Sequence, residues 1–333
     1  MKTSLVATWC VALLCAGPTP SMASGQERRP TAEPWTAART AWGAPDLQGI
    51  WDYRTLTPLE RPDQFDGREF LSSEEIAGLE RERQDRADGR PPGDPRTAPS
   101  VHAPYWLDYG TKAVSSGRSS LIVDPPDGRV PPRSDEGRRL ASERLEARRG
   151  RGATDSFETR SVWERCITRG LPQGMLPAGY NNNLHVLQTP DHVVIMNEMI
   201  HDARIVPLDG RDRLATSVRQ WRGDSRGHWD GDTLVVETTN FSATVNFHGA
   251  TRNLHLEERF RRVGPDTLDY TFTVSDPSAW THPWTVTFPI ERIDGPMYEY
   301  ACHEGNYGLL NILTAARVNE TGADRDTAAA DTR

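Results

Sequence analysis

The sequence predicts a mainly β protein, an antiparallel meander that closes into a lipocalin-like barrel, with an N-terminal extension carrying two short helices. From about Trp163 onward, segments rich in Val, Ile, Thr, Phe and Trp follow one another at short spacing. Their connectors, TPDH, WDGDT, VGPDT and IDGPM, have the turn chemistry of hairpins. The 25 prolines and 27 glycines disfavour a helical bundle. A meander this long commonly closes on itself, because closure removes unpaired edges.

The expected strands alternate in a way that defines two faces. In TLDYTFTV, the apolar Leu268, Tyr270, Phe272 and Val274 are separated by threonines and an aspartate. One face is therefore apolar and the other is solvated. The expected strands are NNLHVLQT, HVVIMNEMI, ARIVPL, DTLVVETTNF, LHLEERFRRV, TLDYTFTV, WTVTFPIERI and PMYEYACH. A barrel of this kind encloses a small apolar or aromatic molecule.

The N-terminal region predicts export and a helical extension. Lys2, the apolar run Leu5 to Ala16 and the small residues before residue 24 have the features of a cleaved signal peptide. The run is too short to span a bilayer, so we expect a periplasmic or secreted protein without membrane insertion. Short strands are expected near Gly49 to Tyr53 and in SSLIVD, and helices in LSSEEIAGLERERQD and SDEGRRLASERLEARRG. The expected divisions are a signal peptide (1–23), a mobile leader (24–45), the extension (46–160), the barrel-like domain (161–316) and a disordered tail (317–333).

The net charge limits the kinds of partner, and the cysteines predict a disulfide. The formal net charge of −8 becomes one unit more negative when Lys2 leaves with the signal. This argues against nucleic acid as a partner. Two cysteines, Cys166 and Cys302, remain after cleavage, and a disulfide between them is the simplest expectation in an oxidising compartment.

The stretch MIHDARIVPLDGR is the first candidate site. Glu198, His201, Asp202 and Arg204 interrupt apolar residues where one strand passes into the next. A histidine with a carboxylate can move a proton, and an arginine can hold a substrate carboxylate with two hydrogen bonds. The alternative is a hairpin end whose arginine forms a structural ion pair.

Two further stretches offer polar groups. GMLPAGYNNNLHV could present Tyr180, Asn182 and His185 to a barrel mouth, although asparagines beside glycines also simply make turns. YACHEGNYG adds His303 beside the expected disulfide. His185, His201 and His303 could bind a metal with a carboxylate, but no HExxH, HxH or paired Cys/His spacing supports it, so no metal or other cofactor is expected.

Several motifs resemble a large, poorly characterised exported family of soil and aquatic bacteria. They are WRGDSRGHWDGDTLVVETTNF, LEERFRRVGPDTLDYTFTVSDPSAWTHPW and YEYACHEGNYG, with APDLQGIWDYRTLTPLERP and SSLIVDPPDGRVPP nearer the N-terminus. The resemblance covers most of the mature chain. It implies that some relatives take part in the catabolism of lignin-derived aromatics, including cofactor-free decarboxylation. The likeness to barrel-shaped phenolic acid decarboxylases is an analogy of fold and transfers no residue.

We therefore expect an exported, cofactor-independent lyase that decarboxylates a small aromatic compound. Arg204 would anchor the substrate carboxylate, His201 with Glu198 or Asp202 would move the proton, and Tyr180 and Asn182 would orient a phenol or carbonyl. Glycine-rich nucleotide loops, a GxSxG elbow and a haem-attachment CxxCH are absent from the sequence. The alternatives are a non-catalytic carrier of lipocalin type and a metal-dependent hydrolase.

Overall fold

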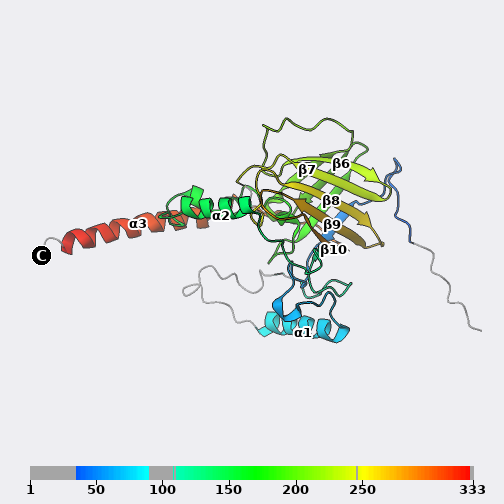
Figure 1. Cartoon of the computed structure of the whole chain (residues 1–333), viewed down its shortest axis with the longest axis horizontal. Coiled ribbons are helices and arrows are strands. Elements are labelled where there is room, and N and C mark those ends of the chain that lie inside the picture. Colours follow the sequence, from blue (N-terminus) through cyan, green and yellow to red (C-terminus); the bar gives the residue numbers. More distant parts are fainter. Residues whose placement is uncertain (1–34, 90–107, 109, 245–246, 331–333) are drawn as a thin grey trace, which may run out of the picture. The chain divides into compact units, whose positions relative to one another are not determined.

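The computed structural model describes residues 35–89, 108, 110–244 and 247–330 (Figure 1). The chain from Thr36 to Arg333 belongs to one compact unit. The expected signal peptide, the first part of the leader and most of the Pro-rich loop before residue 100 lie outside the described residues. Among the helices of the described residues, none is long and apolar enough to cross a membrane.

The core of the protein is a ten-stranded antiparallel sheet, as the sequence predicts for a mainly β protein. Nine strands follow the order β5-β4-β3-β1-β10-β9-β8-β7-β6, and β2 pairs beside β10. Two meanders, β3–β5 and β6–β10, are joined by the N-terminal β1, which pairs with both β3 and β10. The strands are β1 (Gly49–Asp52), β2 (Ile122–Asp124), β3 (Asn183–Gln188), β4 (His192–Asn197), β5 (Ala203–Pro207), β6 (Asp224–Asp230), β7 (Thr233–Thr239), β8 (His255–Arg262), β9 (Thr267–Ser275) and β10 (Trp284–Ile293).

The sheet bends until its outer strands, β5 and β6, lie near one another. Gly227 of β6 has no space for a side chain, because a Cβ there would come within 2.8 Å of Val206 Cγ1 and 2.7 Å of Leu208 Cδ2. No ladder of backbone hydrogen bonds joins these two strands within the described residues. The sheet is thus not closed, and the expected lipocalin-like barrel is not confirmed.

The predicted alternation of faces is confirmed in β9 and β10. Leu268, Tyr270, Phe272 and Val274 are fully buried. On the opposite face, the hydroxyls of Thr271 and Thr287 pair at 2.7 Å, and those of Thr273 and Thr285 at 2.9 Å. The inner face is packed with large side chains, including Trp51, Trp280, Trp284, Tyr53, Phe241, Phe247 and Phe260.

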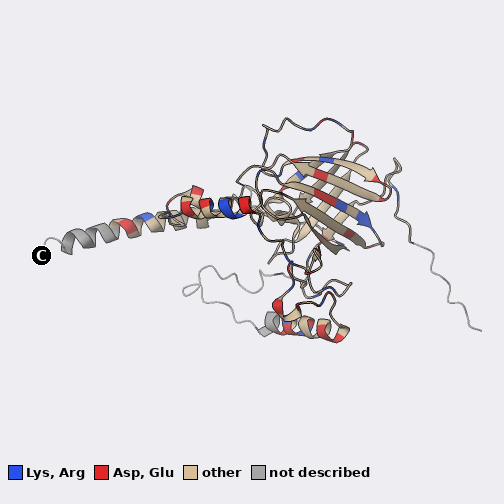
Figure 2. Cartoon of the chain, viewed as in Figure 1, with Lys and Arg blue, Asp and Glu red and all other residues tan. Residues whose placement is uncertain are grey.

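The two expected helices are present as α1 (Ser73–Gly89) and α2 (Asp135–Ala147). Ser72 and Glu75 form a reciprocal cap at the start of α1, and the Ser134 hydroxyl accepts a hydrogen bond from the Gly137 amide in α2. Basic and acidic residues are interspersed along α2 (Figure 2), where Arg139 pairs with Glu136 at 2.6 Å. Caps and surface charge pairs thus contribute to both helices, and Arg144 of α2 also donates to the Gly249 and Ala250 carbonyls.

The C-terminal segment differs from expectation. No strand forms in PMYEYACH, since both sides of β10 are already occupied by β9 and by β1 and β2. The helix α3 (Tyr307–Ala330) replaces the end of the expected barrel-like domain and most of the expected disordered tail. The Asn306 side chain caps it by accepting a hydrogen bond from the Leu309 amide at 3.2 Å. The run GLLNILTAAR consists largely of good helix formers.

Candidate functional site

Backbone strain gathers at one end of the sheet. Among the described residues, the non-glycine positions with positive φ are Cys166, Asn181, Ile200, His201, Asn240 and His248. The first four belong to segments that meet: Cys166 is bonded to Cys302, and His201 Nδ1 lies 3.0 Å from the Tyr300 carbonyl oxygen. A β-branched residue such as Ile200 at φ 64° is a true outlier. Such strain concentrates at functional sites.

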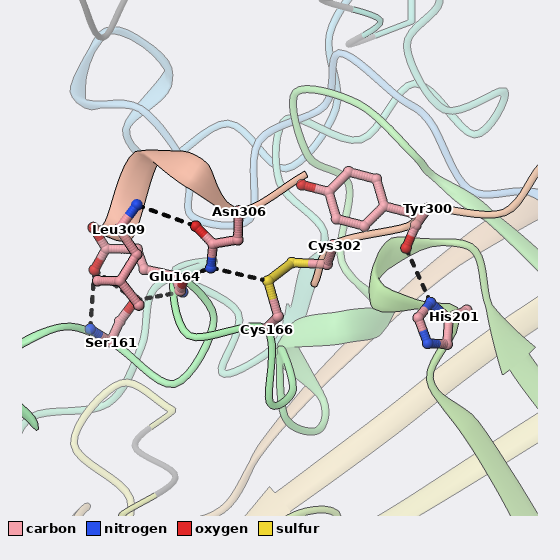
Figure 3. The surroundings of a disulfide bond; sticks show 8 residues. All are labelled: Ser161, Glu164, Cys166, His201, Tyr300, Cys302, Asn306 and Leu309. Atoms are coloured by element: carbon pink, nitrogen blue, oxygen red, sulfur yellow. Dashed lines mark hydrogen bonds between the residues drawn. A yellow bond between two sulfur atoms is a disulfide. The ribbon is translucent and has the colours of Figure 1, made fainter. Parts of the chain in front are cut away.

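The predicted disulfide between Cys166 and Cys302 is present and lies at the centre of this region (Figure 3). Its Cα atoms are 5.6 Å apart and its cysteines are 136 positions apart in sequence. Asn306 supports it, because its Nδ2 donates to the Glu164 carbonyl oxygen at 2.9 Å and lies 3.3 Å from Cys166 Sγ. The disulfide therefore fixes the segment 160–170 against the start of α3.

A cavity of about 500 Å³ lies beside the disulfide, and we call it the disulfide cavity. Trp163, Tyr180 and Tyr300 line it, together with Leu309 and Ile312 of α3. The rings of Tyr180 and Tyr300 are nearly parallel, with centroids 6.3 Å apart and planes inclined by 26°. Aromatic walls of this kind suit a planar ring.

Arg169 lies next to Trp163 of this aromatic wall but does not itself line the cavity. Its guanidinium carbon lies 5.5 Å from the centroid of the Trp163 ring. Its Nη1 is buried and has no hydrogen-bond partner among the described residues. Burial lowers the pKa of Arg169, and interactions with the phenols of Tyr53, Tyr180 and Tyr300 oppose this shift. A buried cationic donor without an acceptor is costly, and a bound carboxylate would satisfy it.

Glu198 supplies a carboxylate that also influences Tyr53. Its Oε2 accepts a hydrogen bond from Asn183 Nδ2 at 2.8 Å, and the residue is 7% exposed. Burial raises the pKa of Tyr53 strongly; Arg169 opposes the shift and Glu198 adds to it. The Tyr53 phenol is thus electrostatically linked to both a buried cation and a buried carboxylate.

Residues 197–202, which we call the site turn, carry three of the predicted catalytic residues. β4 ends at Asn197, so Glu198, His201 and Asp202 do not alternate as they would in a continued strand. His201 is exposed, and Asp202 accepts a hydrogen bond from Thr168 Oγ1 at 2.6 Å. His201 is thus joined to Tyr300 and Asp202 to the segment 160–170, whereas Glu198 is joined to Asn183 of β3.

Arg204 lies elsewhere and corrects the expectation that it anchors substrate. Its side chain enters the interior of the sheet and forms a two-point ion pair with Glu258, in which Nη2 donates to Oε1 at 3.0 Å. The Tyr270 hydroxyl donates to the same carboxylate at 2.9 Å. This is the structural ion pair that the sequence left open as an alternative.

The remaining candidates are also dispersed. Asn182 is buried and closes a turn, with Oδ1 accepting from the Ala178 amide at 2.7 Å and Nδ2 donating to the Ala178 carbonyl at 2.9 Å. His185 lies on β3 opposite Met196, and His303 is exposed in the turn before α3. Within the described ranges, no three His, Cys, Asp or Glu residues are grouped as a metal site.

Three residues of the site escaped the sequence reasoning: Trp163, Arg169 and Tyr300. Trp163 and Arg169 each lie three positions from Cys166, and Tyr300 lies two positions before Cys302. The expected disulfide was therefore the signal that could have brought them together.

A second, smaller cavity of about 230 Å³ lies beside α1, lined mainly by apolar residues such as Leu56, Phe65 and Leu79. The disulfide cavity is the better candidate, because the strained Cys166 lines it and because Arg169, whose Nη1 has no partner among the described residues, lies against its lining residue Trp163. Comparisons with family models, with curated proteins and with solved structures gave no match to this chain.

Proposed function

We propose that the disulfide cavity binds a small aromatic carboxylate and that the protein is an exported, cofactor-independent lyase of the decarboxylase type. The observation that carries the proposal is the buried Nη1 of Arg169, which lacks a partner among the described residues and belongs to a side chain that interacts with all three aromatic residues of the cavity wall. The disulfide supports export to an oxidising compartment.

The cavity suits such a ligand in size and chemistry. Its volume of about 500 Å³ lies within the usual range for small-molecule sites. The ring would lie against Tyr180, Tyr300 and Trp163. Arg169 does not line the cavity, so the carboxylate would reach past Trp163 to pair with it. This pairing would offset the desolvation that lowers the pKa of the Arg169 guanidinium. The site thus lies at the end of a sheet that we regard as an incompletely closed, lipocalin-like barrel.

Decarboxylation of a carboxylate conjugated to a phenol needs no oxidant or reductant. The bond from carbon to the carboxylate breaks, carbon dioxide leaves, and the carbon keeps the electron pair and takes up one proton. Both carboxylate oxygens of Asp202 are engaged, Oδ1 by Arg222 and Oδ2 by Thr168, whereas the hydrogen bonds that Asn183 donates to Glu198 both end on Oε2. We therefore assign proton transfer to Glu198 and His201. Tyr180 orients the ring, and Arg169 replaces Arg204 as the anchor.

A non-catalytic carrier is the second candidate, because His201 is exposed and its Nδ1 is already bonded to the backbone of Tyr300. Both candidates use the same anchor. They differ in whether bound ligand is converted.

The test is to incubate the purified protein with 4-hydroxycinnamate and 4-hydroxybenzoate and to measure carbon dioxide release and binding, with and without a chelator. Chelator-insensitive release that is lost in Arg169→Met supports the lyase. Saturable binding without release, lost in the same variant, transfers the proposal to the carrier. Release abolished by chelator indicates a metal-dependent enzyme, and neither binding nor release overturns the proposal.

A further inference from the structure

The buried side chain of Arg222 joins the two ends of the site turn by hydrogen bonds. Its Nη1 donates to the Asp202 carbonyl oxygen at 2.6 Å and lies 3.1 Å from Asp202 Oδ1, and its Nη2 donates to Asn197 Oδ1 at 2.7 Å. Asn197 and Asp202 are the two ends of the turn, and the Asn197 amide also donates to the Asp202 carbonyl at 3.0 Å. Arg222 therefore spans the base of the turn that contains the strained Ile200 and His201.

Arg222 is itself held firmly. It lies in the turn before β6, where the Gln220 amide donates to the Asn240 carbonyl at 3.0 Å and the Gly223 amide donates to the Gln220 carbonyl at 3.3 Å. A Cβ on Gly223 would meet Thr238 Cγ2 at 2.7 Å, so this turn lies tightly against the end of β7. The Arg222 side chain is only 11% exposed. Arg222 thus connects the site turn to the hairpin of β6 and β7.

The Asp202 carboxylate, which Arg222 contacts, is also hydrogen-bonded to the segment that contains Arg169. Asp202 Oδ2 accepts a hydrogen bond from Thr168 Oγ1 at 2.6 Å, and that hydroxyl in turn accepts one from the Gly170 amide at 2.9 Å. Thr168 and Gly170 flank Arg169 in the chain. A continuous path of hydrogen bonds therefore runs from Arg222 through Asp202 to the backbone on either side of the proposed anchor.

Strained backbone persists only where its surroundings over-determine it. Three hydrogen-bonding residues surround the turn here. Arg222 bonds both of its ends, Asn183 donates to Glu198, and the Tyr300 carbonyl bonds His201. We infer that Arg222 is a positioning residue, which holds the Glu198 carboxylate and the Arg169 guanidinium in register with one another. The inference rests on the proposed function, because Arg222 itself does not line the cavity.

The test compares Arg222→Lys with Arg226→Lys as a matched control. Lysine keeps the buried charge but cannot reach both Asn197 and Asp202. Arg226 is another mostly buried arginine of the same region that pairs with an aspartate, Asp224, and its hydrogen bonds to described residues go to Asp224, Ser225, Arg211 and Asp212, outside the site turn. Hydrogen exchange is followed at the amides of Asn197, His201 and Gly170, and the kcat/KM for 4-hydroxycinnamate is measured in parallel.

In Arg222→Lys we expect exchange at these three amides to rise about tenfold or more, the gain from losing about 1.4 kcal/mol of local protection. We expect kcat/KM to fall on the order of 10- to 100-fold, because small displacements of catalytic groups have effects of this size. Arg226→Lys should change neither measurement. A lower unfolding midpoint in both variants, with equal exchange and equal kcat/KM, would show that Arg222 is merely structural and would overturn the inference.

The exchange measurement keeps this inference separable from the proposed function. If neither variant nor the unaltered protein converts or binds 4-hydroxycinnamate, the proposed function fails, whereas exchange still shows whether Arg222 holds the turn. If Arg222→Lys does not fold, Thr168→Val decides, since it removes only the hydroxyl link. That variant should weaken ligand binding without changing exchange at Asn197 and His201. Unchanged binding in Thr168→Val would contradict the path to Arg169.

Discussion

Arg204 of β5 and Glu258 of β8 form an ion pair across the interior of the sheet, with side chains 4% and 0% exposed. The two strands are far apart in the order of the sheet, so the pair meets only because the sheet bends strongly around its core. Tyr270 completes the carboxylate's hydrogen bonds from the neighbouring strand β9. The pair therefore ties the two meanders together inside the protein.

Removing one member of this pair should destabilise the protein strongly. Arg204→Met leaves the Glu258 carboxylate buried without its cation, and breaking a buried pair in this way costs about 3–5 kcal/mol. Urea unfolding of the variant measures the loss. Arg259→Ala, which removes an arginine whose ion pair with Asp230 is partly exposed, should cost at most about 1 kcal/mol. A similar loss of unfolding free energy in Arg204→Met and Arg259→Ala would contradict the role of the buried pair. So would a double variant, Glu258→Leu with Arg204→Met, that is less stable than Arg204→Met alone.

Arg169→Met should weaken binding of 4-hydroxybenzoate by about 10- to 150-fold. The reason is the loss of one charge-assisted hydrogen bond, worth about 1.5–3 kcal/mol. Quenching of tryptophan fluorescence reports binding, since Trp163 lines the cavity. Arg165→Met is the matched control, because Arg165 also stacks on an aromatic ring. Its guanidinium carbon lies 5.2 Å from the centroid of Phe157, and that of Arg169 lies 5.5 Å from the centroid of Trp163. Equal binding by the two variants would show that Arg169 is not the anchor.

Replacing His201 should separate strain from chemistry. Its φ of 44° is unfavourable for any residue with a Cβ, so His201→Gly should be about 1 kcal/mol more stable than His201→Ala. Both variants should lose turnover if His201 moves the proton. Chemical denaturation and carbon dioxide release measure the two effects. Full turnover in both would remove His201 from the mechanism, and a less stable glycine variant would argue against strain.

Acid should remove the stabilisation that the Glu164 carboxylate, which lines the disulfide cavity, gives to the folded protein. Burial raises the pKa of this carboxyl, but hydrogen bonds from the Ser161 amide and hydroxyl, each 2.9 Å long, and the charge of Arg160 outweigh it, so the pKa is lowered (Figure 3). The stabilisation is complete above the ordinary value of 4.5 and is lost as the pH falls through the lower folded-state pKa.

Glu164→Gln should therefore lower the unfolding midpoint at neutral pH and match the unaltered protein in acid below the folded-state pKa. The comparison is made by thermal unfolding across this range, with Glu158→Gln in the same segment as the control. A difference that persists undiminished in acid would show that the Glu164 charge is not responsible.

Reduction of the Cys166–Cys302 disulfide should abolish ligand binding before it disrupts the sheet. The bond closes a long loop, and removal of such a bond costs about 2–5 kcal/mol. Both cysteines line the cavity, whereas the strands are held by their own ladders. Circular dichroism and 4-hydroxybenzoate binding, followed as dithiothreitol is added, distinguish the two effects. Unaltered binding by reduced protein would separate the disulfide from the site.

Strands and inward-facing residues were predictable where alternation and turn chemistry agreed, as in β9 and β10. The disulfide was predictable because only two cysteines follow the expected signal. The insertion of β1 between β3 and β10 was not, since a strand's partner leaves no mark in its own residues.

β5 shows the limit of hydrophobic patterns. Composition would place Ile205 inside, yet Ile205 is 64% exposed and its neighbour Arg204 is buried. The register with β4, in which Arg204 lies opposite Ile195, decides the faces. The sequence marked residues 198–204 as a candidate site, but the strained backbone at Ile200 was not predictable, because the groups that hold this turn, Arg222, Asn183 and Tyr300, lie elsewhere in the sequence.

The close approach of β6 to β5 at Gly227 bears on how the protein avoids aggregation. Edge strands with free amide and carbonyl groups act as templates onto which other chains add and aggregate. Val206 and Leu208 fill the space above Gly227, so an invading chain would have to separate β5 from β6 before it could pair there. The absence of a side chain at Gly227 thus lets β5 and β6 shield one another, although no ladder of hydrogen bonds joins them in the described part of the chain.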